Sequence, residues 1–536
     1  MKNLRGIYTL LFGVAVLLFF GLAYPHHLHY QEQYQLFLFD STYVWDIVRL
    51  PGGVADLLGR FCTQFFLYAW VGALIIALLL SAIQLLVLRL FSPLGGGWEG
   101  ASFIPSFLLW LFLLDENALL GGVWAVLLTL LASCLFALVP ERPDDQSPKH
   151  PTPWLRLILL FAAVPILYWI VGPVCVVFFL LQIPRHKYSI WYYGAIVLLA
   201  IMIVILSTHL PVSPRSLWTG IHYYRYPTVI PVLLWSAALS VLVLALITCI
   251  CHKQTISKSQ NLKTFLLYAI CFLCGLCAVW KYSNLKAEKV MQYDFMARHQ
   301  QWNRILATIN AEKPNNQIGV TVQNLALGMH GLLADHLFEF NQNGILGLLP
   351  DVQSDATSPL PTAEAFYQLG MINVAQRTVF ECQEAILDFQ KSGRCYKRLA
   401  QTNLINGKYE VARKYLTALQ KTLFYRDWAN ETMALLGDEK AIAKHPEYGR
   451  LRQFAYKENL VLDRDSSRSA NPSEIDGSRL TGEFYFSDHV TPEMLESLYY
   501  GNTDNRLAYE YLKAYYMLTG DREGYNKLLR ELEVRN

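Results

Sequence analysis

Acidic side chains in a long polar segment are the first residues of this chain that could do chemistry. Residues 25–61 contain Glu32, Asp40 and Asp46, and apolar runs flank the segment on both sides. A carboxylate held at a membrane interface loses water, which raises its pKa and makes it usable as a general base. The alternative is that Asp40, Asp46 and Asp56 cap or solvate interfacial helices. We predict a catalytic base among Glu32, Asp40 and Asp46, and the choice between them stays open.

A second acidic segment interrupts the apolar run from Phe103 to Pro140. Asp115 and Glu116 are adjacent there. Two neighbouring carboxylates offer the hard oxygen ligands that Mg²⁺ and Mn²⁺ prefer, so we predict a divalent cation at this pair. The alternative is a helical hairpin turn whose polar residues satisfy exposed backbone groups.

A third segment, residues 209–228, places arginine beside aromatic residues. Arg215, His222 and Arg225 are the candidates here for binding a phosphate group of a cofactor or donor. A guanidinium grips phosphate oxygens in a bidentate manner, which favours this interpretation. An aromatic belt with arginines that reach out of the membrane would have the same composition.

The composition indicates that these segments belong to a membrane protein. Of the 536 residues, 54% are hydrophobic and 16% are charged, against about 25% charged in soluble domains. The part up to Tyr282 contains only 10 of the 42 acids, whereas the part after it has an ordinary charge content. The net charge of +3 is dispersed, which excludes a nucleic-acid binder because no basic stripe exists.

A membrane-spanning helix needs about 20 apolar residues, and the first part offers a series of such runs. We predict about nine spans in residues 1–282. A tight hairpin is expected at Gly172-Pro173, since the surrounding apolar stretch is too long for one ordinary span. The predicted spans are 7–24, 62–88, 102–115, 117–139, 154–171, 173–184, 189–208, 229–251 and 264–281.

The distribution of basic residues predicts the orientation of these spans. With the N-terminus in the cytoplasm, nine spans place most basic loop residues on the cytoplasmic side, as the positive-inside rule requires. The loops 25–61, 115–117 and 209–228 and the whole of 283–536 are then external, which is the periplasm in a Gram-negative inner membrane. The basic residues placed inside are Arg89, Arg142, Lys149, Arg156, Arg185, Lys187, Lys253, Lys258 and Lys263.

Residues 283–536 have the apolar spacing of helices throughout. Short similar patterns recur, and they resemble the tetratricopeptide family of helical repeats. The fold class expected for the chain is therefore all-α, with a transmembrane helical bundle followed by a tetratricopeptide-like solenoid that holds a partner. A generic helical bundle is the alternative. The clearest repeat contains Leu399, Ala400, Gly407, Tyr409, Ala412 and Leu416.

The order of spans and acidic external loops resembles the C-type glycosyltransferase superfamily of polytopic membrane enzymes. The resemblance implies a catalytic acid in the first external loop and metal-binding acids in the first and second loops. One departure is that no Asp-Glu or Asp-Asp pair follows the first span directly. The chain also resembles membrane O-mannosyltransferases that carry such repeats, and an uncharacterised group of Bacteroidota membrane proteins.

Together these features predict a membrane glycosyltransferase that uses a polyprenyl-linked sugar donor and a polypeptide or glycan acceptor outside the cytoplasm. The competing interpretation is a non-enzymatic membrane scaffold of an envelope complex. A transporter is less favoured, because transport usually needs ionisable groups near the middle of the membrane.

Overall fold

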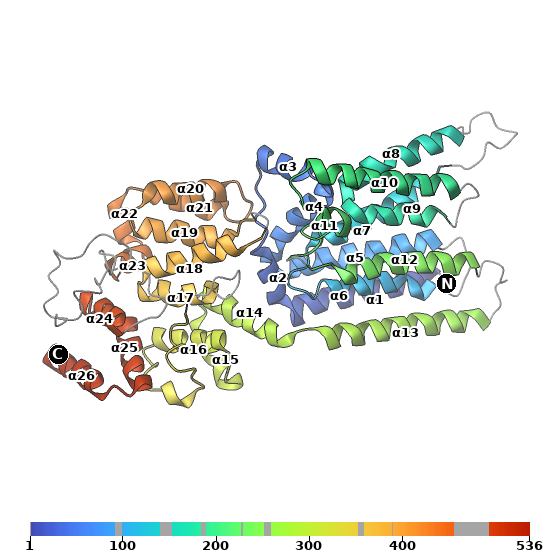
Figure 1. Ribbon diagram of the computed structural model, residues 1–536. Helices are drawn as coiled ribbons and strands as arrows, with labels where there is room; N and C mark the ends of the chain where they lie inside the picture. Colours follow the sequence, from blue (N-terminus) through green and yellow to red (C-terminus); the bar gives the residue numbers. More distant parts are fainter. Residues whose placement is uncertain are drawn as a thin grey trace. The chain divides into compact units, whose positions relative to one another are not determined.

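The computed structural model describes residues 2–91, 99–139, 153–183, 189–226, 229–250, 259–351, 359–387, 390–454 and 492–535. Over these ranges the regular elements are all helices, which confirms the all-α class (Figure 1). Two compact units make up the chain, Met1–Glu288 and Lys289–Asn536. Six of the residues predicted to face the cytoplasm, Arg142, Lys149, Arg185, Lys187, Lys253 and Lys258, lie outside the described residues.

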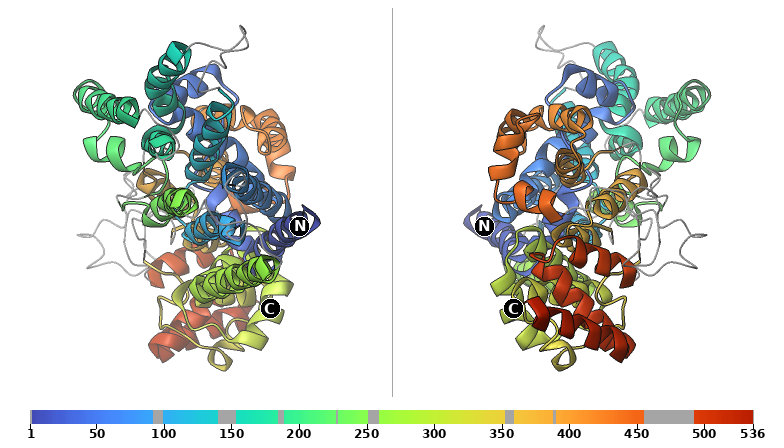
Figure 2. Two further views of the ribbon diagram at one scale, coloured as in Figure 1. Left: turned by 90° about the vertical axis from the view of Figure 1, so that its right-hand side faces the viewer. Right: turned by 90° about the vertical axis from the view of Figure 1, so that its left-hand side faces the viewer.

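The first unit is a bundle of apolar helices, and Figure 2 shows several of them nearly end-on. Its elements are α1 (Lys2–Leu18), the π-helical η1 (Phe19–Ala23), α2 (Pro25–Glu32), α3 (Ser41–Val48), α4 (Gly53–Thr63), η2 (Gln64–Leu67), α5 (Ala69–Phe91), η4 (Glu99–Phe103), α6 (Ile104–Phe112), α7 (Leu120–Phe136), α8 (Pro153–Val171), η5 (Gly172–Cys175), α9 (Val176–Gln182), α10 (Ser189–His209), α11 (Pro214–Thr219), α12 (Val232–Ile250), α13 (Ser259–Tyr282) and the start of α14 (Leu285–Arg298).

Four helices in the described residues are long and apolar enough to cross a membrane, or five if one bent pair forms a single span. The prediction of about nine spans is therefore too high. The four are Arg5–Ala23, Ala69–Phe91, Trp154–Gln182 and Ile190–His209, and the bent pair joins Leu266–Tyr282 to Leu285–Arg298 at 59°.

Two physical reasons account for the difference. Two of the predicted spans are helices of 17 residues or fewer, namely Glu99–Phe112 and Leu120–Phe136. The stretch predicted to hold two spans consists of the 19-residue helix α8 and the 7-residue helix α9, and α9 is too short to cross a membrane. The predicted hairpin between them is present, since Arg156 of α8 and Phe178 of α9 both contact the ring of Phe136. The predicted break at Gly172 is present within this segment as a 3₁₀ turn, and the φ of +75° at Gly172 is readily adopted only by glycine.

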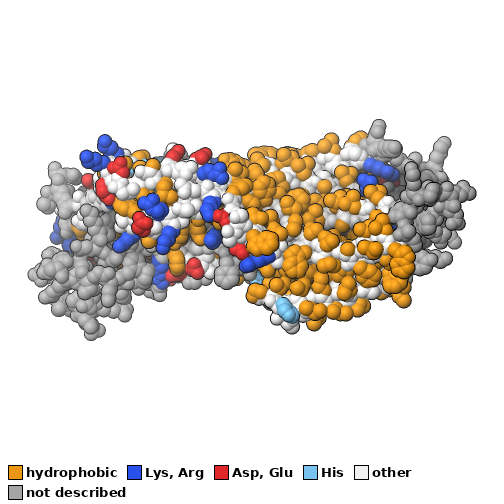
Figure 3. Space-filling model, turned by 90° about the horizontal axis from the view of Figure 1, so that it is seen from above, with side chains coloured by type: hydrophobic (Ala, Val, Ile, Leu, Met, Phe, Trp, Pro, Cys, Tyr) orange, Lys and Arg blue, Asp and Glu red, His pale blue; other side chains and the backbone are white. Residues whose placement is uncertain are grey.

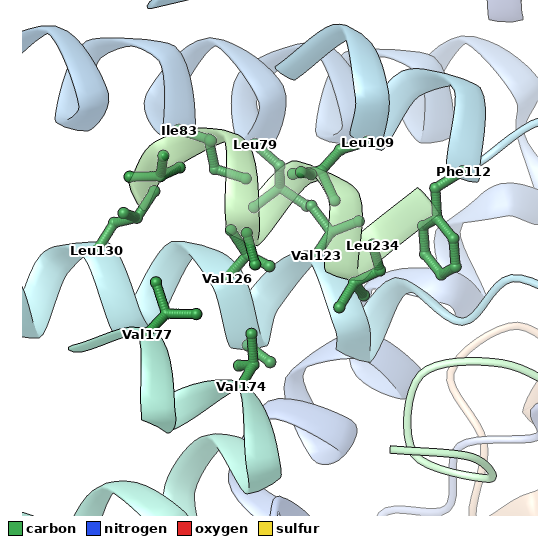
Figure 4. Packing of buried hydrophobic residues seen from close by; sticks show 14 of the residues in the cluster. Leu79, Ile83, Leu109, Phe112, Val123, Val126, Leu130, Val174, Val177 and Leu234 are labelled. Carbon is green, nitrogen blue, oxygen red and sulfur yellow. The ribbon is translucent and has the colours of Figure 1, made fainter. Parts of the chain in front are cut away.

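The core of the first unit consists of aliphatic and aromatic side chains from helices distant in the sequence. Leu79 from α5, Leu109 from α6 and Val123 from α7 point toward one another in Figure 4. Leu234 of α12 packs into the same cluster, and these four side chains are almost completely buried. Short helices such as α6 and α7 therefore belong to the centre of the bundle.

Apolar side chains also cover the outside of this unit. Figure 3 shows an almost continuous hydrophobic face with few charged groups over it. Leu78, Ile158 and Ile190 are each more than 60% exposed. Exposed apolar area of this extent is typical of a surface that contacts lipid chains.

The second unit packs its helices largely in chain order. Contacts join α17 to α18, α18 to α19, α19 to α20 and α20 to α21, so these helices form consecutive hairpins (Figure 1). The elements are α15 (Trp302–Glu312), α16 (Gln317–Met329), η7 (Leu337–Glu339), α17 (Pro359–Leu369), α18 (Ile372–Ala385), α19 (Gly393–Ile405), α20 (Tyr409–Gln420), α21 (Arg426–Leu435), α22 (Glu439–Lys444), α23 (Tyr448–Phe454), α24 (Pro492–Gly501), α25 (Arg506–Thr519) and α26 (Arg522–Arg535).

The clearest predicted repeat corresponds to the hairpin of α19 and α20. Gly407 forms the turn between the two helices with a φ of +72°, a conformation that an L side chain would strain. Leu399, Ala412 and Leu416 are buried, as expected for the apolar positions of a helical hairpin.

A close contact between two glycines leads to a prediction about how α4 and α7 pack. A Cβ atom on Gly59 would lie 2.3 Å from the backbone nitrogen of Gly121, where no atom can be accommodated. We expect Gly59→Ala to lower the free energy of unfolding by about 1–3 kcal/mol through this overpacking. Thermal unfolding of the protein in detergent measures the effect.

Gly194→Ala provides the matched control, because the nearest atom to its added Cβ, in Phe161, is 3.9 Å away. This variant should keep the wild-type melting temperature or raise it slightly, since alanine favours a helix more than glycine does. Equal melting temperatures for the two variants would contradict the close packing of α4 on α7.

Candidate functional site

The first polar loop begins with α2, whose N-terminus is held by an acid from α14. The backbone N–H groups of His26 and His27 donate to the Glu288 carboxylate at 2.7 and 2.9 Å. The first amides of a helix have no partner within the helix, and negative charge there is favourable. Glu288 is nevertheless buried, and burial raises its pKa to about 7, with the two amide bonds lowering it only in part.

Two side chains one turn apart on α2 reach the turn that follows α6. His27 Nε2 lies 2.9 Å from the carbonyl oxygen of Leu113, and Gln31 Nε2 donates to the carbonyls of Asp115 and Ala118 at 3.3 Å each. Burial lowers the pKa of His27 to about 4, so the ring is neutral at pH 7. Because a carbonyl only accepts, the proton must be on Nε2.

The turn at 113–119 also pairs with the segment 220–226. Tyr226 N donates to the carbonyl of Asn117 at 2.8 Å, and Leu119 N donates to the carbonyl of Tyr224 at 2.9 Å. Because these two segments pair, the Arg225 guanidinium forms an ion pair with the Asp115 carboxylate. Arg225 Nη1 also donates to its neighbour's carbonyl, that of Tyr226, at 2.7 Å.

Glu116 lies at a small cleft formed where these three segments meet. The cleft is small, with a volume of about 10 Å³, which is room for about one water molecule, and it is partly open to solvent. Burial raises the pKa of Glu116, the adjacent Asp115 charge raises it further, and Arg225 offsets part of this increase. Polar side chains that line the cleft are Gln31, Tyr34, Gln35, Thr63, Asn117 and Tyr226.

The three candidate acids of the first loop occupy different environments. Asp40 caps α3 by accepting from Thr42 N at 2.9 Å, and Asp46 forms an exposed ion pair with Arg49 at 3.2 Å. Glu32, by contrast, is buried at the last turn of α2. Asp40 and Asp46 therefore have the capping and solvating roles that were the alternative to catalysis.

The three candidates of the third loop are also separated. Arg215 is exposed on α11, whereas Arg225 joins Asp115. His222 lies in the turn between them, in a left-handed conformation with a φ of +68°. Of the predicted phosphate-binding residues, Arg225 is thus the one that contacts an acid of the second loop.

Sequence reasoning missed His27, Gln31 and Glu288. The spacing of His27 and Gln31, four residues apart on one helix face, was a usable signal because it places two polar groups side by side. Nothing local marked Glu288, since its partners are about 260 residues earlier in the chain.

The predicted divalent cation fits this geometry poorly. Asp115 already faces the positive guanidinium of Arg225, which would repel a cation bound to the same carboxylate. Across the described residues no group of three His, Cys, Asp or Glu side chains could hold a metal ion. The cation stays a prediction, and we derive no chemical step through it.

The raised pKa of Glu288 leads to a prediction about pH dependence. An unfolded glutamate loses its proton near pH 4.5, whereas the folded one loses it near pH 7. Over this window the folded state binds more protons, so stability should fall as pH rises, by roughly 3 kcal/mol in all. We expect Glu288→Gln to flatten this decline in thermal unfolding measured between pH 4.5 and 8.

Glu312→Gln is the control, because Glu312 forms a partly exposed ion pair with Lys289 at 2.8 Å. It should retain the wild-type decline. A Glu288→Gln protein with an unchanged decline would show that another group causes the pH dependence.

Comparison with known proteins gives one match. The model of a family of unknown function, DUF6057, matches residues 1–535. No curated protein and no solved structure matches the chain. Because the match extends over nearly the whole length, the chain belongs to the DUF6057 family.

Proposed function

We propose that the protein is a membrane glycosyltransferase that moves a sugar or glycan from a polyprenyl phosphate or diphosphate to an acceptor outside the cytoplasm. The observation that carries the proposal is the meeting of three polar loops at Glu116 and the Asp115–Arg225 pair. An enzyme needs its acid and its cation close together, whereas loops that only connect helices have no such need.

Glu116 is the group best suited to act as general base. It lies in a polar cleft, and its pKa is raised by burial and by Asp115. A base with a pKa nearer neutrality accepts the proton of an acceptor hydroxyl more effectively than an ordinary carboxylate does. The hydroxyl oxygen would then attack the sugar carbon that carries the lipid phosphate.

Arg225 is suited to stabilising the leaving phosphate group. Its ion pair with Asp115 and its bond to the Tyr226 carbonyl fix the guanidinium beside the cleft. A fixed guanidinium can stabilise the negative charge that develops on phosphate oxygens without reorganising during the reaction. In this scheme Asp115 orients Arg225 and does not touch the substrate.

The apolar outer surface supports a lipid-linked donor. A polyprenyl chain is hydrocarbon, so it would reach the cleft from the membrane alongside the exposed apolar side chains of the first unit. The proposal further places the N-terminus in the cytoplasm and the polar loops and second unit on the external side of the inner membrane, from the positive-inside rule.

The helical hairpins of the second unit would hold the acceptor. Stacked hairpins of the tetratricopeptide kind present an extended surface, which suits a polypeptide or a glycan chain. Their consecutive packing from α17 to α21 supports this part of the proposal.

A non-enzymatic scaffold is the second candidate. It is favoured by the structural roles of Asp40 and Asp46, since these acids cap a helix and pair at the surface. In this case the cleft at Glu116 would be an ordinary polar junction between loops.

Replacing single acids by their amides distinguishes the glycosyltransferase from the scaffold. We expect Glu116→Gln to lower glycan transfer at least about 100-fold, because the amide cannot accept the proton, while Asp46→Asn retains transfer. The measurement is mass spectrometry of envelope glycans and glycoproteins in a deletion strain that carries each variant at equal protein level.

Full transfer by Glu116→Gln would exclude its role as base. If the deletion strain itself lost no glycan, the transferase proposal would fail and the scaffold would be preferred.

A further inference from the structure

The second unit contains a group of cationic side chains around α19 that the proposed transfer does not use. Five cations lie here with only three carboxylates near them in the described residues. The cations are Arg298, Arg394, Lys397, Arg398 and Arg450, and the carboxylates are Asp294, Glu364 and Glu447.

Each carboxylate already has a defined partner. Asp294 accepts two bonds from Arg394, at 2.6 and 2.8 Å. Glu364 pairs with Arg398, and Glu447 accepts from the hydroxyl of Tyr367 at 2.9 Å. The acids therefore leave an excess of positive charge close to α19.

Arg398 has one donor that its acidic partner does not use. Its guanidinium stacks on the Tyr367 ring at 3.6 Å and uses Nη2 for Glu364. Nη1 is buried and has no hydrogen-bond partner among the described residues. A buried donor without an acceptor is costly, and the cost is larger for a charged group.

Lys397, next to Arg398 on α19, carries a second positive charge. Its ammonium lies 4.9 Å from the centre of the Trp428 ring, and no ion pair joins it to an acid in the described part of the chain. Burial lowers the pKa of Lys397, and the charges of Arg298 and Arg398 lower it further. The charges of Glu447 and Glu364 favour the charged form of this lysine, but neither acid forms an ion pair with it in the described residues.

We propose that Lys397 and Arg398 bind a doubly charged oxyanion, such as the phosphate group of a ligand, at α19. Ammonium and guanidinium groups are donors only, so their partner must present acceptor oxygens. Two negative charges would balance the two excess positive ones. The Trp428 and Tyr367 rings, which contact Lys397 and Arg398, would shield the bound group from water.

The site is independent of the transfer chemistry, because every residue in it belongs to the second unit. If no anion binds at α19, the proposed role of Glu116 as a base is unaffected. If Glu116 proves not to be the base, the proposed anion site at α19 is likewise unaffected.

The test is calorimetric titration of the full-length protein in detergent with inorganic phosphate, at constant ionic strength set by chloride. A parallel titration with succinate distinguishes a phosphate from a pair of carboxylates as the source of the charge. We expect saturable binding of phosphate, weakened at least about tenfold in Lys397→Gln and retained in Lys397→Arg, because the ammonium charge supplies one of the two contacts.

Lys414→Gln is the matched control, since Lys414 is exposed on the neighbouring helix α20 outside the cluster. It should bind phosphate like the wild type. Binding of succinate alone, with the same dependence on Lys397, would support the oxyanion site and assign it to carboxylates.

A measurement on the wild-type protein covers the case in which Lys397→Gln does not fold. Phosphate should slow the labelling of Lys397 by an amine-reactive reagent and leave the labelling of Lys414 unchanged. Absence of saturable binding by either anion, or equal affinity of the wild type and a folded Lys397→Gln protein, would overturn the proposal.

Discussion

The turn between α6 and α7 depends on hydrogen bonds that it cannot make within itself, and this constraint determines the arrangement of the polar loops. Its carbonyls at Leu113 and Ala118 accept from His27 and Gln31 of α2, and Gln31 also donates to the Asp115 carbonyl, which accepts from Ala118 N within the turn. At the edge of an apolar bundle, water is scarce and an unpaired carbonyl is costly. The first loop therefore has to fold against the second, and Glu116 is enclosed as a result.

Much of the fold could be predicted from sequence, because hydrophobic period and composition are local signals. They located the helical class, the apolar first part and the hairpin turn at Gly407 correctly. The number of spans could not be obtained in this way. Helix α7 is as apolar as a span but is buried within the bundle, and hydropathy does not distinguish a protein interior from lipid.

The site was predictable only in part, for a related reason. An acid's role depends on its neighbours in space, so Asp46 at the surface and Glu116 in the cleft could not be separated by residue type. The pairing of Asp115 with Arg225 joins residues 110 positions apart. That distance explains why a cation site was predicted for a carboxylate that already has a guanidinium as its partner.

The buried charged groups of both units follow one physical rule. Where a buried charge has its counterpart, as in the Asp294–Arg394 pair with bonds of 2.6 and 2.8 Å, the pair supports the local fold and needs no ligand. Where a buried donor has no acceptor, as at Arg398 Nη1, the folded chain bears a cost that a bound acceptor would remove. Glu116 lies between these cases, since Arg225 offsets only part of its cost. An incompletely compensated charge is thus a better indicator of function in this chain than the number of acids in a loop.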